Sequence, residues 1–200
     1  MRIVVCDIET DSANPANAEI LEIYLGEYRN GLIVNELELR VRPRRWNLKS
    51  EESIKIHNIT MTEAMNGLDW KRSMKKIYDF LPDEPCYFLC HANRRAGTRG
   101  CFDYQVLTTH FNQLNSDIYF YFLKILPPDK VISTHSLVKH YLQLEANDLK
   151  NACKHFGITI SNHHAAKSDA IACLEIFKHF EKKIDIAKFV DNDFYDMPHE

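Results

Sequence analysis

The sequence has no apolar run long enough to cross a bilayer, and it contains no internal repeat or low-complexity segment. The N-terminus leads from Met1 through a short apolar stretch directly to Asp7, so we expect no signal peptide. We therefore expect a cytoplasmic protein without a membrane partner, with a cell's nucleus or a virus-infected cell as the alternatives. The 200 residues suffice for one well-packed domain and are too few for two ordinary ones. We predict one domain over residues 1–185 and a C-terminal tail over residues 186–200.

The cysteines lack the spacing of a metal site. None of the six forms a Cys-x-x-Cys pair, which is the usual sign of a structural zinc site. We expect them to be small buried hydrophobic residues in a reducing compartment. They are Cys6, Cys86, Cys90, Cys101, Cys153 and Cys173.

The chain also lacks a strong excess of charge of either sign. Its net charge is −3, so binding to nucleic acid would require local basic clusters. Each such cluster, taken singly, is more often a solvated surface, and both interpretations stay open. The clusters are Arg40, Arg42, Arg44, Arg45 and Lys49; Lys71, Arg72, Lys75 and Lys76; and Arg94, Arg95 and Arg99.

The first forty residues have the pattern of an antiparallel meander. Residues 3–8 form a short β-branched run that ends in acids, which is typical of a buried central strand. Residues 18–28 and 32–41 are two further apolar-rich runs, and Asn30-Gly31 stands between them. Asn-Gly between two such runs strongly favours a β-hairpin.

Helical and extended patterns alternate in the rest of the chain. Thr60 and Glu63 have capping-box spacing, Asp69 is a candidate N-cap, and Gly157 fits the left-handed residue that ends a helix. We predict helices over residues 50–56, 69–81, 102–114, 148–155 and 164–180, another from residue 136, and strands over 86–90 and 131–132. The pattern predicts an α/β domain with a five-stranded mixed sheet, an antiparallel meander plus parallel strands, flanked by helices.

Asp7 and Glu9 form the first candidate site. Residues i and i+2 of a strand point to the same face, so both carboxylates should lie together beside a buried strand. Two close anions repel each other unless a cation joins them, and Mg²⁺ and Mn²⁺ prefer oxygen ligands. Two solvated acids at a strand end are the alternative.

Two further acids lie at helix positions. Asp103 follows a glycine-containing loop at the start of a helix, where it is either a ligand or a first-turn acid that stabilises the helix dipole. Asp169 lies inside a helix beside alanines, which would let that face pack tightly on the sheet that carries Asp7 and Glu9. An exposed position on a solvated face is the alternative for Asp169.

The three elements together resemble the DEDDh branch of the DEDD exonucleases. The motifs of that family are Asp-x-Glu on the first strand, Phe-Asp after the fourth strand and His-x-x-x-x-Asp on a late helix. Here they correspond to Asp7-Ile8-Glu9, to Phe102-Asp103 and to the segment from His164 to Asp169. Similar segments occur at Ile56-His57-Asn58-Ile59-Thr60, at His91-Ala92-Asn93 and over residues 149–158, so the resemblance covers nearly all of residues 1–180.

The resemblance implies a ribonuclease H-like fold and a metal-dependent 3′-to-5′ exonuclease that releases nucleoside 5′-monophosphates. It implies two ions of Mg²⁺ or Mn²⁺ per active site, with Asp7 bridging both, Glu9 and Asp169 completing one site and Asp103 supporting the other. It also implies that His164 is the general base, a role that suits an unperturbed pKa of ~6.5. His163 is the rival, and only His164 has the family's spacing to Asp169.

The sequence departs from the family at two places. Thr10-Asp11-Ser12 follows Glu9 where the family has a small run that contacts the terminal nucleotide, so Asp11 adds an anion. A basic insertion over residues 94–101 precedes Phe102, and its arginines either bind substrate phosphates or are solvated. The candidate substrate-binding residues are Thr10, Asp11, His91, Asn93, Arg95 and Arg99.

The sequence defines the substrate and the partners of the protein only in part. We expect nucleic acid with a free 3′ end, without a choice between DNA and RNA or between single and double strands. Relatives include monomers and dimers, so a homodimer and a polymerase or nucleoprotein partner are both open. A catalytically silent nucleic-acid-binding or polymerase-associated module is the alternative function, and the complete set of carboxylates argues against it.

Overall fold

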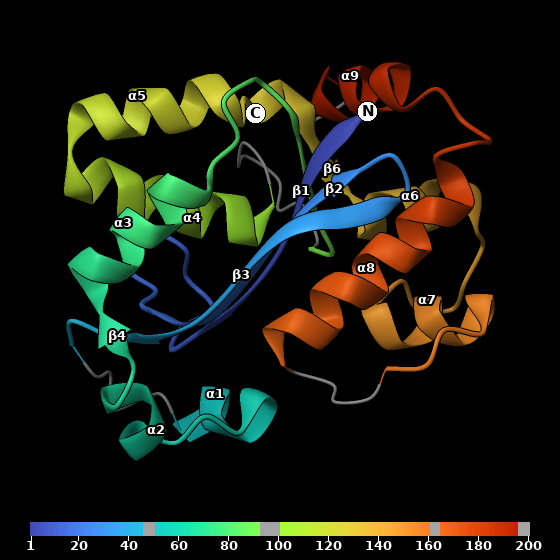
Figure 1. Ribbon diagram of the computed structural model, residues 1–200. Helices are drawn as coiled ribbons and strands as arrows, with labels where there is room; N and C mark the ends of the chain where they lie inside the picture. Colours follow the sequence, from blue (N-terminus) through green and yellow to red (C-terminus); the bar gives the residue numbers. More distant parts are fainter. Residues whose placement is uncertain (46–50, 93–100, 161–164, 196–200) are drawn as a thin grey trace.

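The computed structural model describes residues 1–45, 51–92, 101–160 and 165–195, which form a mixed sheet with helices on both faces (Figure 1). The sheet has six strands in the order β4-β3-β2-β1-β5-β6. The strands are β1 (Arg2–Thr10), β2 (Ile20–Arg29), β3 (Leu32–Arg42), β4 (Leu68–Asp69), β5 (Tyr87–Cys90) and β6 (Val131–Ser133). This order places β1 in the interior of the sheet, with β2 on one side and β5 on the other.

The predicted antiparallel meander is confirmed. β1 pairs with β2 and β2 pairs with β3, both antiparallel. Asn30 and Gly31 join β2 to β3 with φ angles of 54° and 89°, the left-handed backbone that a tight hairpin turn requires. β5 pairs in parallel with β1 and with β6, so the sheet is mixed, as expected.

The sheet has one strand more than the five that the sequence predicts. The additional strand, β4, consists of two residues that pair in parallel with Val41 and Arg42 at the end of β3. A strand of this length is too short for an alternating pattern to reveal it. Gly67 permits the backbone before β4 to lie close to the end of β3, because a Cβ at this position would lie 2.7 Å from backbone atoms of Val41 and Arg42.

The helices follow the predicted ranges closely. The helical elements are α1 (Glu51–His57), α2 (Met61–Met65), α3 (Trp70–Phe80), α4 (Phe102–Leu114), α5 (Ser116–Ile125), the 3-10 turn η2 (Pro128–Lys130), α6 (Thr134–Tyr141), α7 (Leu149–Phe156), α8 (Ala166–Phe180) and α9 (Ile186–Tyr195). The capping box of Thr60 and Glu63 is present, and Asp69 caps α3 by accepting from two backbone N–H groups. Gly157 ends α7 with a φ of 71°.

Two helices differ from the expectations. The sequence suggested no helix over α5, which Asn115 caps by accepting from the backbone N–H groups of Asp117 and Ile118. From residue 186 onward we expected a tail, whereas α9 begins there and buries Ile186, Phe189 and Val190. These apolar side chains explain the difference, because their burial holds the segment against the domain.

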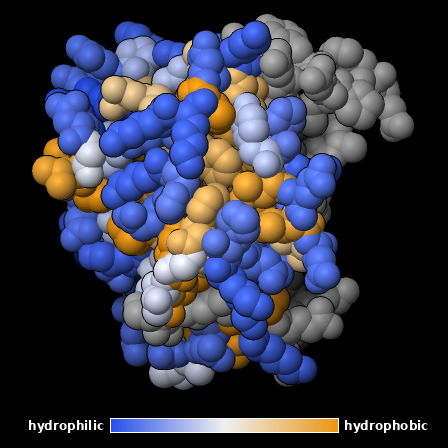
Figure 2. Space-filling view, turned by 90° about the vertical axis from the view of Figure 1, so that its right-hand side faces the viewer, coloured by the Kyte–Doolittle hydropathy of each residue, from blue (hydrophilic) through white to orange (hydrophobic). Residues whose placement is uncertain are grey.

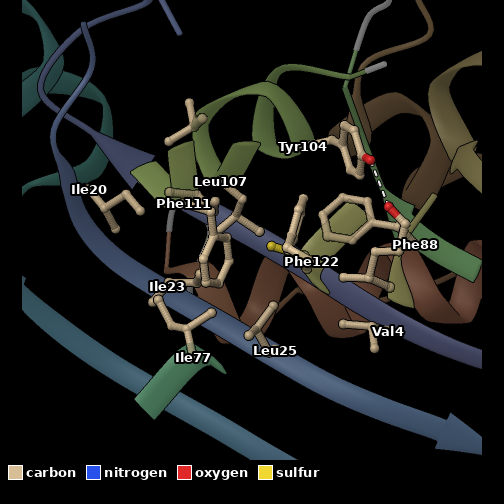
Figure 3. Packing of buried hydrophobic residues seen from close by; sticks show 14 of the residues in the cluster. Val4, Ile20, Ile23, Leu25, Ile77, Phe88, Tyr104, Leu107, Phe111 and Phe122 are labelled. Atoms are coloured by element: carbon tan, nitrogen blue, oxygen red, sulfur yellow. Dashed lines mark hydrogen bonds between the residues drawn. The ribbon is translucent and has the colours of Figure 1, made fainter. Parts of the chain in front are cut away.

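The two larger hydrophobic clusters of the described residues lie on the two faces of the sheet, and a small third one joins Leu21, Ile59 and Ala64. The first core fills the space between the sheet and α3, α4 and α5, and Figure 3 shows Phe88, Phe111 and Phe122 at its centre. The Tyr104 hydroxyl, also buried there, donates to the Leu126 carbonyl oxygen over 2.6 Å (Figure 3). The second core lies between the other face and α6 to α9. The six cysteines are all free and buried, as expected.

The second core brings α8 close to the central strands. Ala166 and Ala170 on α8 are fully buried, and they belong to the same core as Ile3 and Val5 of β1. Figure 2 shows the side of the molecule on which α7 and α8 lie in Figure 1, where polar side chains surround apolar ones near the middle. Within the described part of the chain, no helix has both the length and the apolar character of a membrane span.

Candidate active site

Strand β1 presents Asp7 and Glu9 on the face of the sheet that α8 covers. In the register of β1 with β2, Asp7 lies opposite Tyr24 and Glu9 lies opposite Glu22. The register shifts between Glu9 and Thr10, where the strand leaves its regular pairing. The two carboxylates therefore lie together at the C-terminal end of β1, which is the end of the sheet near α1 and α2 (Figure 1).

Helix α8 adds the third carboxylate. Asp169 lies in the first turn of α8 and is only 5% exposed. Asp7, Glu9 and Asp169 each offer a carboxylate oxygen, and these three oxygens lie within 4.8 Å of one another. The buried alanines of α8 permit this approach, as the sequence suggested for Asp169. A strand and a helix from opposite ends of the chain thus form one group of acids.

Helix α4 places Asp103 beside this group. Asp103 lies in the first turn of α4 and is 5% exposed. Its Oδ1 accepts a hydrogen bond from the backbone N–H of Ile8 over 3.2 Å, so it contacts the strand between Asp7 and Glu9. The carboxylate therefore anchors α4 to β1 and also adds a fourth negative charge to the group.

Burial raises the pKa values of Asp7, Glu9 and Asp103, and repulsion between the acids raises those of Asp7 and Glu9 further. Burial is the largest cause for Asp7, whose pKa lies well above its usual value, and the charges of Asp103, Glu9 and Asp169 raise it further. Burial and the charges of Asp169 and Glu22 raise the pKa of Glu9 to about 8. Burial raises the pKa of Asp103 to about 6, against the effect of the hydrogen bond from Ile8.

These shifts show that the ionised group is unstable without a counter-charge. A divalent cation between the oxygens would favour the ionised forms and remove the repulsion. The donors are all carboxylate oxygens, which suit hard cations such as Mg²⁺ and Mn²⁺. The residues of this group therefore fit a divalent metal site.

Most of the sequence matches a known protein family. The family model described as exonuclease (RNase_T) matches residues 4–177, which include all four carboxylates. The chain belongs to this exonuclease family. It is a DEDD-type member with the ribonuclease H-like fold.

The chain also resembles a bacterial polymerase in sequence and solved exonuclease structures in fold. The chain is 30% identical over 192 residues to the PolC-type DNA polymerase III of Thermotoga maritima, a match that covers 92% of the chain and 12% of the polymerase. E. coli exonuclease I in complex with a dT13 oligonucleotide has the same fold, with a TM-score of 0.76 at 18% identity over 91% of the chain. The zinc-bound complex of the same enzyme with single-stranded DNA gives a TM-score of 0.75 at 18% identity over 94% of the chain. The chain spans 41% and 42% of these two enzyme chains.

Several predicted site residues of this exonuclease-family chain lie outside the described residues. They are Asn93, Arg94, Arg95, Arg99, His163 and His164, together with Lys49 of the first basic cluster. Thr10 is described, and its hydroxyl donates to the carbonyl oxygen of Ser12 over 2.9 Å. Thr10 thereby stabilises the turn that follows β1.

Asp11 and His91 both have partners within the chain. The buried Asp11 carboxylate accepts from the backbone N–H of Glu19 over 2.8 Å. The two ring nitrogens of His91 bond to the Thr134 hydroxyl over 2.8 Å and to the Asn147 carbonyl oxygen over 3.1 Å. Burial lowers the pKa of His91 to about 4, so the ring is neutral near pH 7 and donates from Nε2 to the Asn147 carbonyl.

The first basic cluster consists largely of internal ion pairs. Arg44 binds the buried carboxylate of Glu19 through its backbone N–H and its guanidinium. The guanidinium also lies 4.3 Å from the ring centroid of Trp70. Arg40 forms an ion pair with Glu22. Neither of these glutamates was among the predicted site residues, because a lone acid in a strand, such as Glu22, or just before one, such as Glu19, has no motif that marks it.

The second basic cluster has a different environment. Its four members lie on the exposed side of α3. Lys75 pairs with Asp79 one turn further along the helix, at 2.7 Å. Such exposed pairs contribute little to stability, so this cluster has the character of a solvated surface.

Proposed function

We propose that this domain is a metal-dependent 3′-to-5′ exonuclease of the DEDDh type that releases nucleoside 5′-monophosphates from single-stranded nucleic acid. The observation that carries the proposal is the group of carboxylate oxygens from Asp7, Glu9 and Asp169, all within 4.8 Å of one another. Asp103 adds a further acid through its bond to Ile8. A silent binding module has no need of buried acids whose charges repel one another.

Two cations of Mg²⁺ or Mn²⁺ would fit this set of four acids. Asp7 would bridge both, Glu9 and Asp169 would complete one site, and Asp103 would support the other. The chemistry that such a pair supplies is activation of the attacking water and stabilisation of the leaving oxygen at phosphorus. The four carboxylates would provide the negative charge that holds the pair.

His164 would accept the proton of the attacking water. It stands two residues before the start of α8 in the sequence and five before Asp169. An imidazole with a pKa of ~6.5 exchanges protons near neutral pH. In His164→Ala, we expect the lower limb of the pH–rate profile to disappear, whereas His163→Ala should keep it. The reverse result would assign the role to His163.

Single-stranded DNA is the favoured substrate, with RNA as the alternative. Solved relatives contain dT13 and dA16 oligonucleotides, and the matching relative in Thermotoga maritima is a DNA polymerase, which favours a polymerase partner. Thr10, Asn93, Arg95 and Arg99 would contact the terminal nucleotides. Asp11 and His91 would support the rim of the site through their bonds within the chain.

The test of the proposal is release of mononucleotides from matched 3′-end-labelled DNA and RNA strands. We expect release with Mg²⁺ or Mn²⁺, none with EDTA, and none from Asp7→Asn. Asp79→Asn, which removes an exposed carboxylate on α3, is the matched control and should retain full activity. Stable binding of the strands without release in either metal would instead identify a binding module.

A second measurement addresses the arginines of residues 94–101. Each phosphate contact that is lost reduces the slope of log affinity against log salt by about 0.7 for single strands. We expect Arg95→Ala and Arg99→Ala each to reduce the slope by about this amount. An unchanged slope in both variants would show that these arginines do not contact phosphates.

A further inference from the structure

Glu22 of β2 joins the strand that carries two of the acids to the helix that carries the third. It lies directly opposite Glu9 in the register of β1 with β2, on the face covered by α8. The side chain is buried, with 8% of the residue exposed. Its Oε1 accepts a hydrogen bond from the backbone N–H of Ala166 over 2.9 Å. The two bonded residues are 144 positions apart in the sequence.

This bond replaces a local helix cap. Most helices begin with a side chain that accepts one of the first free N–H groups. The N-cap of α8 is Ala165, which has no side-chain acceptor, and no side-chain cap bond is present there. The Glu22 carboxylate accepts from the first N–H of α8 instead, where the helix dipole also favours an anion. The start of α8 is therefore fixed to the sheet rather than to its own loop.

Arg40 completes the arrangement from the next strand. It lies opposite Glu22 in the register of β2 with β3, and its guanidinium pairs with the other carboxylate oxygen of Glu22. Both oxygens of Glu22 are thus engaged, one by the helix and one by the arginine. A carboxylate held in this way has one orientation, which suits a role in positioning more than a role as a further metal ligand.

We propose that Glu22 is a positioning residue that sets the place of Asp169 relative to Asp7 and Glu9, and that it thereby determines how tightly the site binds divalent cations. Asp169 lies three residues after Ala166, within the same first turn of α8. Its backbone N–H donates to the Ala165 carbonyl oxygen over 3.1 Å, so a shift of the first turn moves Asp169 with it. The inference rests on the proposed function of the carboxylates as metal ligands.

The test uses Mn²⁺ binding to the intact chain in the absence of nucleic acid, measured by calorimetry. Partners that orient metal ligands typically contribute 10–100-fold in metal affinity. We expect Glu22→Ala to weaken Mn²⁺ binding about tenfold and to speed hydrogen exchange of the Ala166 amide. Glu22→Gln keeps an oxygen acceptor without the charge, and we expect a smaller change in the same direction in both measurements.

Glu36→Gln is the matched control. Glu36 also contacts the first turn of α8, through an ion pair of 3.0 Å with Lys167, but its side chain is 50% exposed. Because it binds a flexible side chain rather than the helix backbone, we expect Mn²⁺ affinity within twofold of the wild type. Equal losses in Glu22→Ala and Glu36→Gln would contradict a specific role for Glu22.

The outcomes separate this inference from the proposed function. Mn²⁺ affinity within twofold of the wild type in folded Glu22→Ala would overturn the inference. If that variant does not fold, unchanged affinity and unchanged Ala166 exchange in Glu22→Gln would overturn it instead. A wild-type protein that binds Mn²⁺ and releases no nucleotide would contradict only the proposed function. A wild-type protein that binds no Mn²⁺ would contradict both.

Discussion

The contribution of Glu9 to the stability of the metal-free protein should fall as the pH rises from 5 to 7.5. In the unfolded chain Glu9 ionises at its ordinary pKa of 4.5, whereas in the folded protein it keeps its proton until about pH 8. Below pH 4.5 Glu9 is protonated in both the folded and the unfolded state, and its contribution to stability is fully present. Between pH 4.5 and pH 8 the unfolded chain loses the Glu9 proton and the folded protein keeps it. The titration of Glu9 therefore favours unfolding as the pH rises.

The magnitude follows from the proton balance. When the folded protein retains one proton that the unfolded chain has lost, the free energy of unfolding decreases by about 1.4 kcal/mol per pH unit. From pH 5 to 7.5 this amounts to about 3 kcal/mol for Glu9 alone. For a domain of this size, about 3 kcal/mol corresponds to a decrease in Tm of roughly 6–12 °C. The raised pKa of Asp7 acts in the same direction.

The assay is thermal unfolding in EDTA across this pH range, with Glu9→Gln as the reference. The variant cannot ionise at position 9. The histidines and the surface acids are the same in both proteins, so the difference between their pH slopes reports the titration at the buried acid group. Excess Mn²⁺ should reverse the trend, because a bound cation favours the ionised acids; at 100 times its Kd it adds about 2.7 kcal/mol. Equal pH slopes for both proteins in EDTA would refute the reasoning.

Three further predictions concern buried hydrogen bonds, each measured by urea unfolding. Asp103→Ala leaves the Ile8 N–H without its acceptor and should lower the free energy of unfolding by about 1–3 kcal/mol. Asp103→Asn keeps an oxygen acceptor and should be more stable than Asp103→Ala. Equal losses of stability in the two variants would show that the bond is unimportant. Asp11→Ala should cost a similar amount through the Glu19 N–H, and Asp11→Asn should restore most of it unless the charge itself matters. Trp70→Phe removes the 2.7 Å bond to His110 and should cost about 1–2 kcal/mol; no loss would mean that water replaces the indole.

The sequence predicted those parts of the fold whose signals are local. The Asn30-Gly31 turn, the capping box at Thr60 and the left-handed Gly157 each depend on a few adjacent residues, and all are present in the structure. Helix α5 was not predicted, because residues 118–123 are apolar or aromatic without interruption and give no helical period. Strand β4 was not predicted, because two residues carry no alternation.

The same distinction applies to the carboxylates. Asp7 and Glu9 were expected on one face because alternation along a strand is a local property, and Asp169 could be placed near them from its motif and its small neighbours. The bond from Ile8 to Asp103 joins residues 95 positions apart, and no local pattern announces it. The sequence therefore indicated which acids belong together, while the bond that anchors α4 to β1 had to come from the structure.

The arginines at the end of β3 show why a cluster of charge is a weak signal by itself. Their density suggested either phosphate contacts or a solvated surface, yet Arg40 and Arg44 pair with the buried Glu22 and Glu19. A buried carboxylate needs a partner, and the partner can come from any strand that the topology brings beside it. In a sheet this pairing depends on register, which places Arg40 opposite Glu22 and Glu22 opposite Glu9. The same register that groups the acids thus also places the Arg40 guanidinium where it holds Glu22 beneath α8.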